Sequence, residues 1–202
     1  QMDCIAGRER IMLSTSMKLG TQLLGLSTLI NSGRPAFDGC YRVIALGGTP
    51  VIEFFERAPG NGEHPVRFLP YRTEKIAEAA LAGREVISGE FTGCVMASFK
   101  VGDALYAGHV DTNKATSQRA EWDKRKSAGL EVVSEYDSTG KIQDAHGAAA
   151  VILCVADGGT GAISHFHVSK TRYQYGHHRA ANAPITEYKF DTLYTVISSA
   201  GY

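Results

Sequence analysis

A cysteine and a histidine stand at the two ends of what the sequence predicts to be one β-hairpin. Cys94 follows a glycine in Phe91-Thr92-Gly93-Cys94, and His109 lies fifteen residues further along the chain. A thiol beside an imidazole can act as a nucleophile with its general base, because the imidazole takes up the thiol proton and leaves thiolate. The pair therefore predicts a thiol enzyme.

The hairpin itself follows from residue types. Residues 95–99 and 104–109 are rich in strand-forming side chains, and Gly102-Asp103 between them is typical of a tight turn. Antiparallel strands joined by a short turn bring the residues at their open ends opposite each other. Cys94 and His109 both lie at the open end, so they can meet if their side chains share a face. The alternative is a buried small hydrophobic cysteine beside a structural histidine.

The stretch 66–112, about a quarter of the chain, resembles the bacterial glutamine deamidase toxins. The closest likeness is to the Burkholderia lethal factor, followed by the catalytic domain of cytotoxic necrotizing factor and, more distantly, by the glutamine deamidase of chemotaxis receptors. The matching elements are Leu69-Pro70 with Tyr71, the Thr92-Gly93-Cys94 turn, and His109 with Val110-Asp111. Two members of this group place a threonine six residues before the cysteine, where this chain has Ser88.

The resemblance implies a role for each matching residue. Cys94 would be the nucleophile, His109 the general base and Ser88 the third group, which orients the imidazole through its hydroxyl. A backbone carbonyl has this orienting role in the necrotizing factors, and the sequence does not place its equivalent here. Ser88 followed by glycine is equally typical of a turn before a strand.

The reaction implied is acyl transfer from a glutamine carboxamide, with no metal or organic cofactor. Water as the acceptor gives deamidation to glutamate, whereas an amine gives transglutamination, and another thiol hydrolase on the same residues is a further alternative. The oxyanion needs fixed donors, which are typically backbone N–H groups. We expect Thr92 and Gly93 to supply them, because glycine permits backbone angles that turn N–H groups inward.

Other cysteines compete with Cys94 for the role of nucleophile. The four cysteines are widely spread without a CxxC pair, which excludes a disulfide scaffold or zinc framework and favours reduced thiols. Cys40 also follows a glycine and is the main rival, although it lacks a histidine at hairpin distance. Cys154 lies in a run that is apolar throughout, and we expect it to be buried.

A histidine-rich segment supports an alternative to both enzyme hypotheses: a non-catalytic binding module in which Cys94 is inert. His165 and His167 alternate on a predicted strand and so point the same way, and His177-His178 follow. These imidazoles could hold zinc. We favour a polar sheet face instead, because no Cys or carboxylate completes a typical ligand spacing. His146 is a backup candidate for the base.

Composition limits the partners. The 202 residues, 44% of them hydrophobic, are consistent with a single domain that has a sizeable core. The 21 Lys and Arg residues balance the 21 Asp and Glu residues, which disfavours a nucleic-acid-binding surface or a membrane-adhering face. We expect a monomer. The resemblance implies a secreted bacterial effector or toxin that acts in the host cytosol on a translation-initiation helicase or a Rho-family GTPase.

The order of elements predicts an α+β fold in one globular unit. Residues 1–36 form an N-terminal helical segment and 37–202 the deamidase-like domain, and the resemblance implies a β-sandwich of mixed sheets flanked by helices. Leu19, Leu23, Leu26 and Ile30 share one face of a predicted helix, which we favour over a signal peptide. The chain begins at Gln1, as expected of a processed or trimmed piece. Further helices are predicted at 73–82 and 113–127, and further strands at 41–46, 51–56, 66–69, 130–136, 148–156, 162–168 and 188–197.

Overall fold

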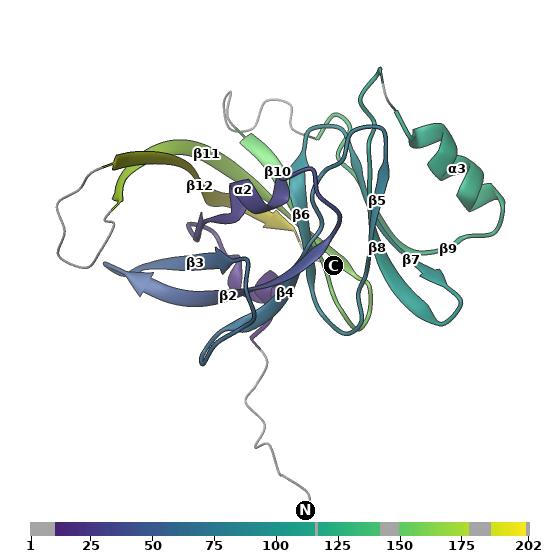
Figure 1. Cartoon of the computed structure of the whole chain (residues 1–202). Coiled ribbons are helices and arrows are strands. Elements are labelled where there is room, and N and C mark those ends of the chain that lie inside the picture. The colour runs from purple at the N-terminus through teal and green to yellow at the C-terminus, as the bar shows by residue number, and fades with distance from the viewer. Residues whose placement is uncertain (1–10, 116, 142–149, 178–186, 201–202) are drawn as a thin grey trace, which may run out of the picture.

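The computed structural model describes residues 11–115, 117–141, 150–177 and 187–200, without the side chains of 174–177, 187–190 and 199–200. Within these residues the chain forms a closed eight-stranded barrel beside a four-stranded antiparallel sheet (Figure 1). The barrel strands are β1 (Gln22–Leu24), β2 (Phe37–Leu46), β3 (Thr49–Phe55), β4 (His64–Phe68), β6 (Val86–Phe91), β10 (Ala150–Ala156), β11 (Ile163–His177) and β12 (Glu187–Ala200). They close in the order β1-β12-β11-β10-β6-β4-β2-β3.

The four-stranded sheet has the order β5-β8-β7-β9. Its strands are β5 (Ile76–Ala80), β7 (Val95–Val101), β8 (Ala104–Val110) and β9 (Glu131–Asp137). The helices are α1 (Leu13–Ser16), α2 (Leu26–Ile30) and α3 (Arg119–Ser127). Figure 1 shows the barrel on the left and the sheet on the right, with α3 on the side of the sheet that faces away from the barrel.

The barrel wall formed by β6 and β10 is buried on both faces. Along β10, Val151, Leu153 and Val155 join the core inside the barrel, whereas the residues between them pack outward against the sheet. This two-sided burial explains why the β10 segment is apolar throughout. Ser88 of β6 lies opposite Cys154 in the register, so it too is on the wall that faces the sheet.

The sheet also has two buried faces. Met96 of β7 and Ala107 of β8 belong to the cluster between sheet and barrel, whereas Val95 and Phe99 pack against Trp122 of α3. Trp122 is 1% exposed and its Nε1 donates to the Glu135 carboxylate at 2.7 Å. The helix predicted at 113–127 is present as α3, although it begins at Arg119.

The expected β-sandwich flanked by helices is confirmed only in part: the strand-rich character is correct, whereas the sandwich arrangement and the flanking helices are not. The described part of the chain is mostly β, and its strands close into a barrel where a sandwich was expected. The predicted hairpin at 95–109 is present as β7–β8, and the strands predicted at 41–46 and 51–56 are present as the antiparallel pair β2–β3. The strands predicted at 66–69, 130–136, 148–156, 162–168 and 188–197 correspond to β4, β9, β10, β11 and β12.

Two helix predictions are wrong. The segment 19–30 contains strand β1 and the short helix α2, separated by Gly25 at φ +74°. A Cβ at Gly25 would lie 2.8 Å from the Phe54 carbonyl oxygen, so this close approach requires glycine and interrupts the helix. The segment 73–82 contains β5, where Ala77 and Ala79 are buried while Glu78 between them is exposed. Burial of every second residue is the pattern of a strand. The alanines, which are good helix formers, led to the prediction of a helix instead.

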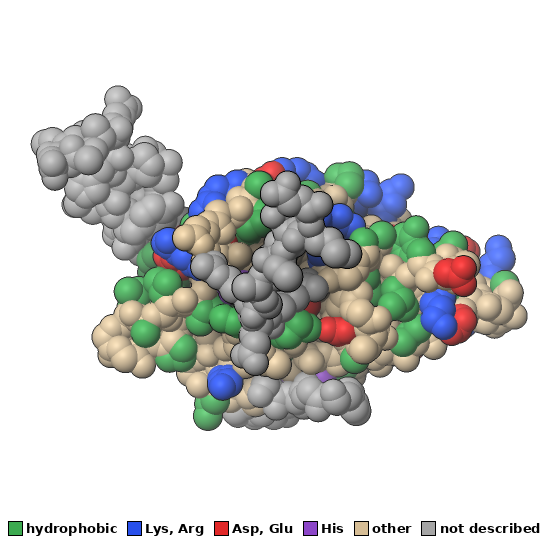
Figure 2. Space-filling model, turned by 90° about the horizontal axis from the view of Figure 1, so that it is seen from below, with side chains coloured by type: hydrophobic (Ala, Val, Ile, Leu, Met, Phe, Trp, Pro, Cys, Tyr) green, Lys and Arg blue, Asp and Glu red, His purple; other side chains and the backbone are tan. Residues whose placement is uncertain are grey.

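Charges on the surface are mixed rather than segregated. Figure 2 shows basic and acidic side chains next to each other at the end of the molecule that carries the four-stranded sheet. There, Arg125 pairs with Glu78 and Glu121, and Lys126 with Asp123 and Glu135. No helix in the described residues is long and apolar enough to cross a membrane.

Candidate functional site

The register of the β7–β8 hairpin places Cys94 and His109 on the same face of the sheet. Met96 lies directly opposite His109, and Cys94 stands two residues before Met96 at the end of the strand. Since alternate residues share a face, Cys94 and His109 are diagonal neighbours, whose Cα atoms are typically about 7–8 Å apart. Packing agrees with this, because Cys94 contacts the cluster between sheet and barrel and the His109 ring stacks on Phe91 at 4.1 Å.

A relay of hydrogen bonds from the barrel orients the imidazole. Ser88 Oγ donates to the Leu69 carbonyl oxygen at 2.6 Å and lies 2.9 Å from His109 Nδ1. The hydroxyl has one proton, which points at the carbonyl, so Nδ1 must carry a hydrogen and donate it to Oγ. His109 Nε2 is then left with a free lone pair, as a general base requires. Hydroxyl and backbone carbonyl, which the sequence left as alternatives, act here in series.

The His109 imidazole is enclosed by aromatic rings. It is 1% exposed, between Phe91 and the Tyr71 ring, whose centroid is 5.3 Å from its own. Burial lowers its pKa to about 3, against a smaller opposing effect of the Asp111 carboxylate. Nε2 is buried and has no hydrogen-bond partner among the described residues. His109 is therefore neutral across the physiological range, with an unused acceptor at Nε2.

The Cys94 thiol lies in a cavity of about 450 Å³. One wall is the 92–94 turn and another is the segment 111–114, while Tyr71 and Glu90 contribute from other elements. A cavity of this size is large enough for one side chain of a partner molecule. His109 and Ser88 are buried and do not line the cavity.

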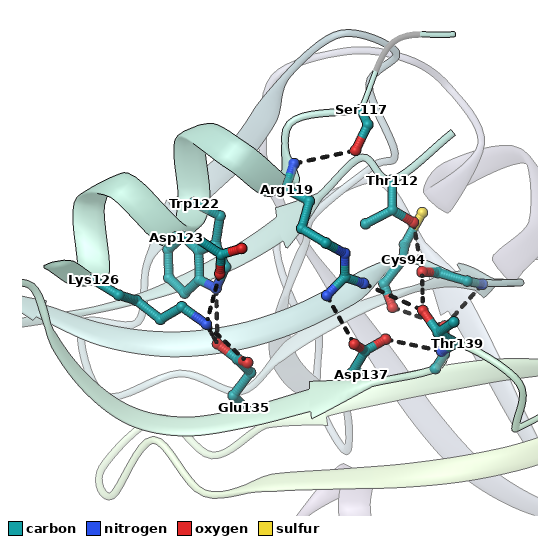
Figure 3. A network of polar contacts seen from close by, with 12 residues as sticks. Cys94, Thr112, Ser117, Arg119, Trp122, Asp123, Lys126, Glu135, Asp137 and Thr139 are labelled. Atoms are coloured by element: carbon teal, nitrogen blue, oxygen red, sulfur yellow. Dashed lines mark hydrogen bonds and ion pairs between the residues drawn. The ribbon is translucent and has the colours of Figure 1, made fainter. Parts of the chain in front are cut away.

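The Cys94 thiol is protonated in the free protein. Burial raises its pKa, as does the nearby Asp111 carboxylate, while the N–H and hydroxyl of Thr112 and the charge of Arg119 oppose the increase. Figure 3 shows the sulfur beside Thr112. This direction of the pKa shift runs against the expectation that the imidazole holds the thiol as thiolate.

Asp111 is a buried residue of the cavity wall. Its buried carboxylate accepts hydrogen bonds from the Tyr71 hydroxyl at 3.0 Å and from the N–H groups of Glu74 and Asn113, both at 2.9 Å. The contact with Tyr71 keeps that ring against the His109 imidazole. The Val110-Asp111 pair of the motif thus has a structural role at the site, which the residue types alone did not specify.

The turn before the nucleophile differs from expectation at Gly93. Gly93 has a φ of +147°, which favours glycine, but its N–H donates to Ser138 Oγ at 2.9 Å and does not face inward as an oxyanion donor. Its carbonyl oxygen accepts from the hydroxyls of Thr112 and Thr139, at 2.5 and 3.0 Å (Figure 3). Thr92 lines the cavity. In the described residues the N–H of Cys94 donates to no acceptor. It is therefore a better candidate for the oxyanion donor than the N–H of Gly93.

The rival cysteines have structural positions. Cys40 is fully buried in the barrel wall, where its Sγ lies 3.5 Å from a Glu63 carboxylate oxygen. Its pKa is raised mainly by burial and also by the contact with Glu63. Cys154 is fully buried between barrel and sheet, and burial raises its pKa well above the ordinary value. Of the three cysteines that the structure describes, Cys94 has its thiol at a cavity.

The histidine-rich segment is brought together only in part. His165 and His167 share a face of β11, with ring centroids 6.1 Å apart, and His165 stacks on Tyr136 at 4.1 Å. Burial lowers the His165 pKa, and His167 adds to this. Where side chains are described, no three His, Cys, Asp or Glu residues gather as a metal-ligand set. The side chains of His146, His177 and His178 lie outside the described residues.

Alkylation by iodoacetamide tests the protonation state of the thiol. We expect Cys94 to react slowly at a pH of about 6.5 and faster as the pH rises past the ordinary range of a thiol pKa, because the reactive thiolate is disfavoured by burial. Peptide mass spectrometry reads each cysteine separately, with Cys154 as the fully buried reference. Fast labelling of Cys94 at the lower pH, slowed in a His109→Ala variant, would instead show a preformed ion pair.

A scan against protein-family models finds no matching family, and a search of curated proteins finds no matching relative. Function is therefore argued from the geometry of the site.

Proposed function

We propose that this protein is a glutamine deamidase, with Cys94 as nucleophile and His109 as general base. The observation that carries the proposal is the relay from the Leu69 carbonyl through Ser88 to His109 Nδ1, which leaves Nε2 as a free acceptor on a side chain that shares a sheet face with Cys94. A buried nitrogen without a partner costs about 1–3 kcal/mol. His165 Nδ1 is left in the same way, so the hydrogen-bond relay through Ser88 is what distinguishes His109. A catalytic base needs the free Nε2 for the substrate reaction.

The first half of the reaction forms a thioester. The glutamine side chain enters the cavity and Sγ of Cys94 attacks the carboxamide carbon, while the thiol proton moves to His109 Nε2. The carbonyl π electrons move to oxygen, and the Cys94 N–H stabilises the resulting oxyanion. The intermediate collapses when the C–N bond breaks, and the departing nitrogen takes the proton from Nε2 and leaves as ammonia.

The second half hydrolyses the thioester. Water gives a proton to His109 Nε2 as its oxygen attacks the acyl carbon, and the C–S bond then breaks. The proton returns to Sγ, so that the free thiol and neutral imidazole are restored and the net change is glutamine and water to glutamate and ammonia. A primary amine in place of water would leave a substituted amide, which is transglutamination.

The setting of this activity rests on the resemblance of 66–112 to the deamidase toxins. We propose that the protein is a secreted bacterial effector, and that its substrate is a glutamine on a folded regulatory protein of the host cytosol. A translation-initiation helicase and a Rho-family GTPase are the two substrate classes to test first. The cavity at Cys94 supports a protein substrate, because it admits one side chain and opens at the surface.

The decisive experiment incubates the protein with members of both substrate classes and follows ammonia release, with peptide mass spectrometry of each glutamine. We expect conversion of one glutamine to glutamate by the wild type and none by a Cys94→Ala control. A parallel reaction with a primary amine separates the alternatives, since an amine adduct on the same glutamine would identify a transglutaminase. Binding without conversion, lost on changing His165 or His167, would instead support the non-catalytic binding module.

A further inference from the structure

Ser138 holds the backbone on both sides of the Cys94 α-carbon. It immediately follows β9, is 1% exposed, and accepts the Gly93 N–H on its Oγ at 2.9 Å. The same hydroxyl donates to the Cys94 carbonyl oxygen at 2.8 Å, and the Ser138 N–H donates to that oxygen at 3.1 Å. One buried side chain thus fixes the peptide group before Gly93 and the peptide group after Cys94.

The peptide group between these two is fixed by threonine hydroxyls. Thr112 and Thr139 both donate to the Gly93 carbonyl oxygen. In a trans peptide the N–H points away from the C=O, so the Cys94 N–H is directed away from both hydroxyls. It has no acceptor in the described parts of the chain, and Gly93 and Cys94 both line the cavity.

We propose that Ser138 is a positioning residue that presents the Cys94 N–H as the oxyanion donor. The inference rests on the proposed deamidase function and specifies how that site stabilises its intermediate. Oxyanion donors accelerate a reaction because they are oriented before charge develops, so a backbone that can rotate loses the benefit. Without the Ser138 hydroxyl, the Gly93 N–H loses its acceptor and the Cys94 carbonyl one of its two donors.

The link also ties the nucleophile to α3. Thr139, next to Ser138, accepts a hydrogen bond from the Arg119 guanidinium at 3.2 Å, and that guanidinium pairs with Asp137 at 2.9 Å (Figure 3). The segment 137–139 is therefore anchored at the start of α3 as well as at the Cys94 turn. This anchoring gives Ser138 the fixed position that an orienting group needs.

The test compares Ser138→Ala with Ser138→Thr, which keeps the hydroxyl. We expect Ser138→Ala to lower kcat for glutamine deamidation about 100-fold with KM within a few-fold of wild type, the size of effect seen when an oxyanion donor is lost. Its Cys94 should react with iodoacetamide as fast as in the wild type, because alkylation at a saturated carbon forms no oxyanion. Ser138→Thr should recover most of the kcat. Thr139→Val, which removes one of two bonds to Gly93, should lose less.

Each outcome decides something. Wild-type kcat in folded Ser138→Ala overturns the inference, and so does an equal loss of kcat and alkylation rate, which would show a structural role. If Ser138→Ala does not fold, kcat is measured in Ser138→Cys instead, since its slightly larger thiol fills the same place but is a weak hydrogen-bond acceptor. If the wild-type protein deamidates no glutamine, the proposed function itself is wrong. This result is obtained before any Ser138 variant is measured, so the two failures are distinguishable.

Discussion

Replacing Cys94 by serine is expected to lower glutamine deamidation about a thousandfold or more while leaving the fold intact. The effect is large because a serine hydroxyl is a much weaker acid and a poorer nucleophile than a thiol. The thiol proton is far easier to transfer. The variant keeps the volume of the side chain, so we expect its free energy of unfolding to change by no more than about 1 kcal/mol.

The matched control for this change is Cys40→Ser, at the other cysteine that follows a glycine. Cys40 is buried in the barrel wall, where its sulfur contacts Glu63 and the Ala58 carbonyl. We expect this variant to keep the wild-type kcat per folded molecule. The assay follows ammonia release and the mass of the target glutamine peptide for both variants. A fully active Cys94→Ser together with an inactive Cys40→Ser would show that the wrong thiol has been assigned.

Local sequence was sufficient for the hairpin that carries the site. The turn at Gly102-Asp103 and the strands beside it are local features, and the short connection fixes which residues lie opposite each other. Cys94 and His109 could therefore be placed on neighbouring strands from sequence alone. Whether they share a face required the register, in which Met96 lies opposite His109.

Contacts between distant segments could not be predicted in the same way. Ser88 was expected either at the site or in a turn, and it lies in β6 because that strand pairs with β10 some sixty residues later. Ser138 was missed, since it reaches the nucleophile from a strand 44 residues away and belongs to no local motif. The closure of the barrel likewise depends on β1 pairing with β12 at the other end of the described chain. Short-range patterns carry no information on such pairings.

Replacing His109 by glutamine is expected to change both activity and the pH dependence of stability. Loss of the general base should lower kcat/KM by about 10²–10⁴-fold. The wild type should also show no acidic limb near the ordinary histidine pKa of about 6.5, because the pKa in the free protein is about 3. Profiles of kcat/KM between neutral pH and the onset of acid unfolding check this expectation. An acidic limb near 6.5, absent from the variant, would show an exposed and titrating histidine instead.

The stability effect has a definite sign. In the unfolded chain His109 binds a proton below about 6.5, whereas in the folded protein it does so only near 3. Between these values the unfolded state binds the extra proton, so the free energy of unfolding decreases as the pH falls, by at most about 1.4 kcal/mol per pH unit from this group. The contribution is fully present above 6.5 and is absent from His109→Gln. Urea unfolding of both proteins from pH 7.5 to 4.5 should therefore show a steeper loss in the wild type, since all other titrating groups cancel in the difference. Parallel curves would mean that His109 is not held as a buried neutral imidazole, and the relay through Ser88 would then have no base to orient.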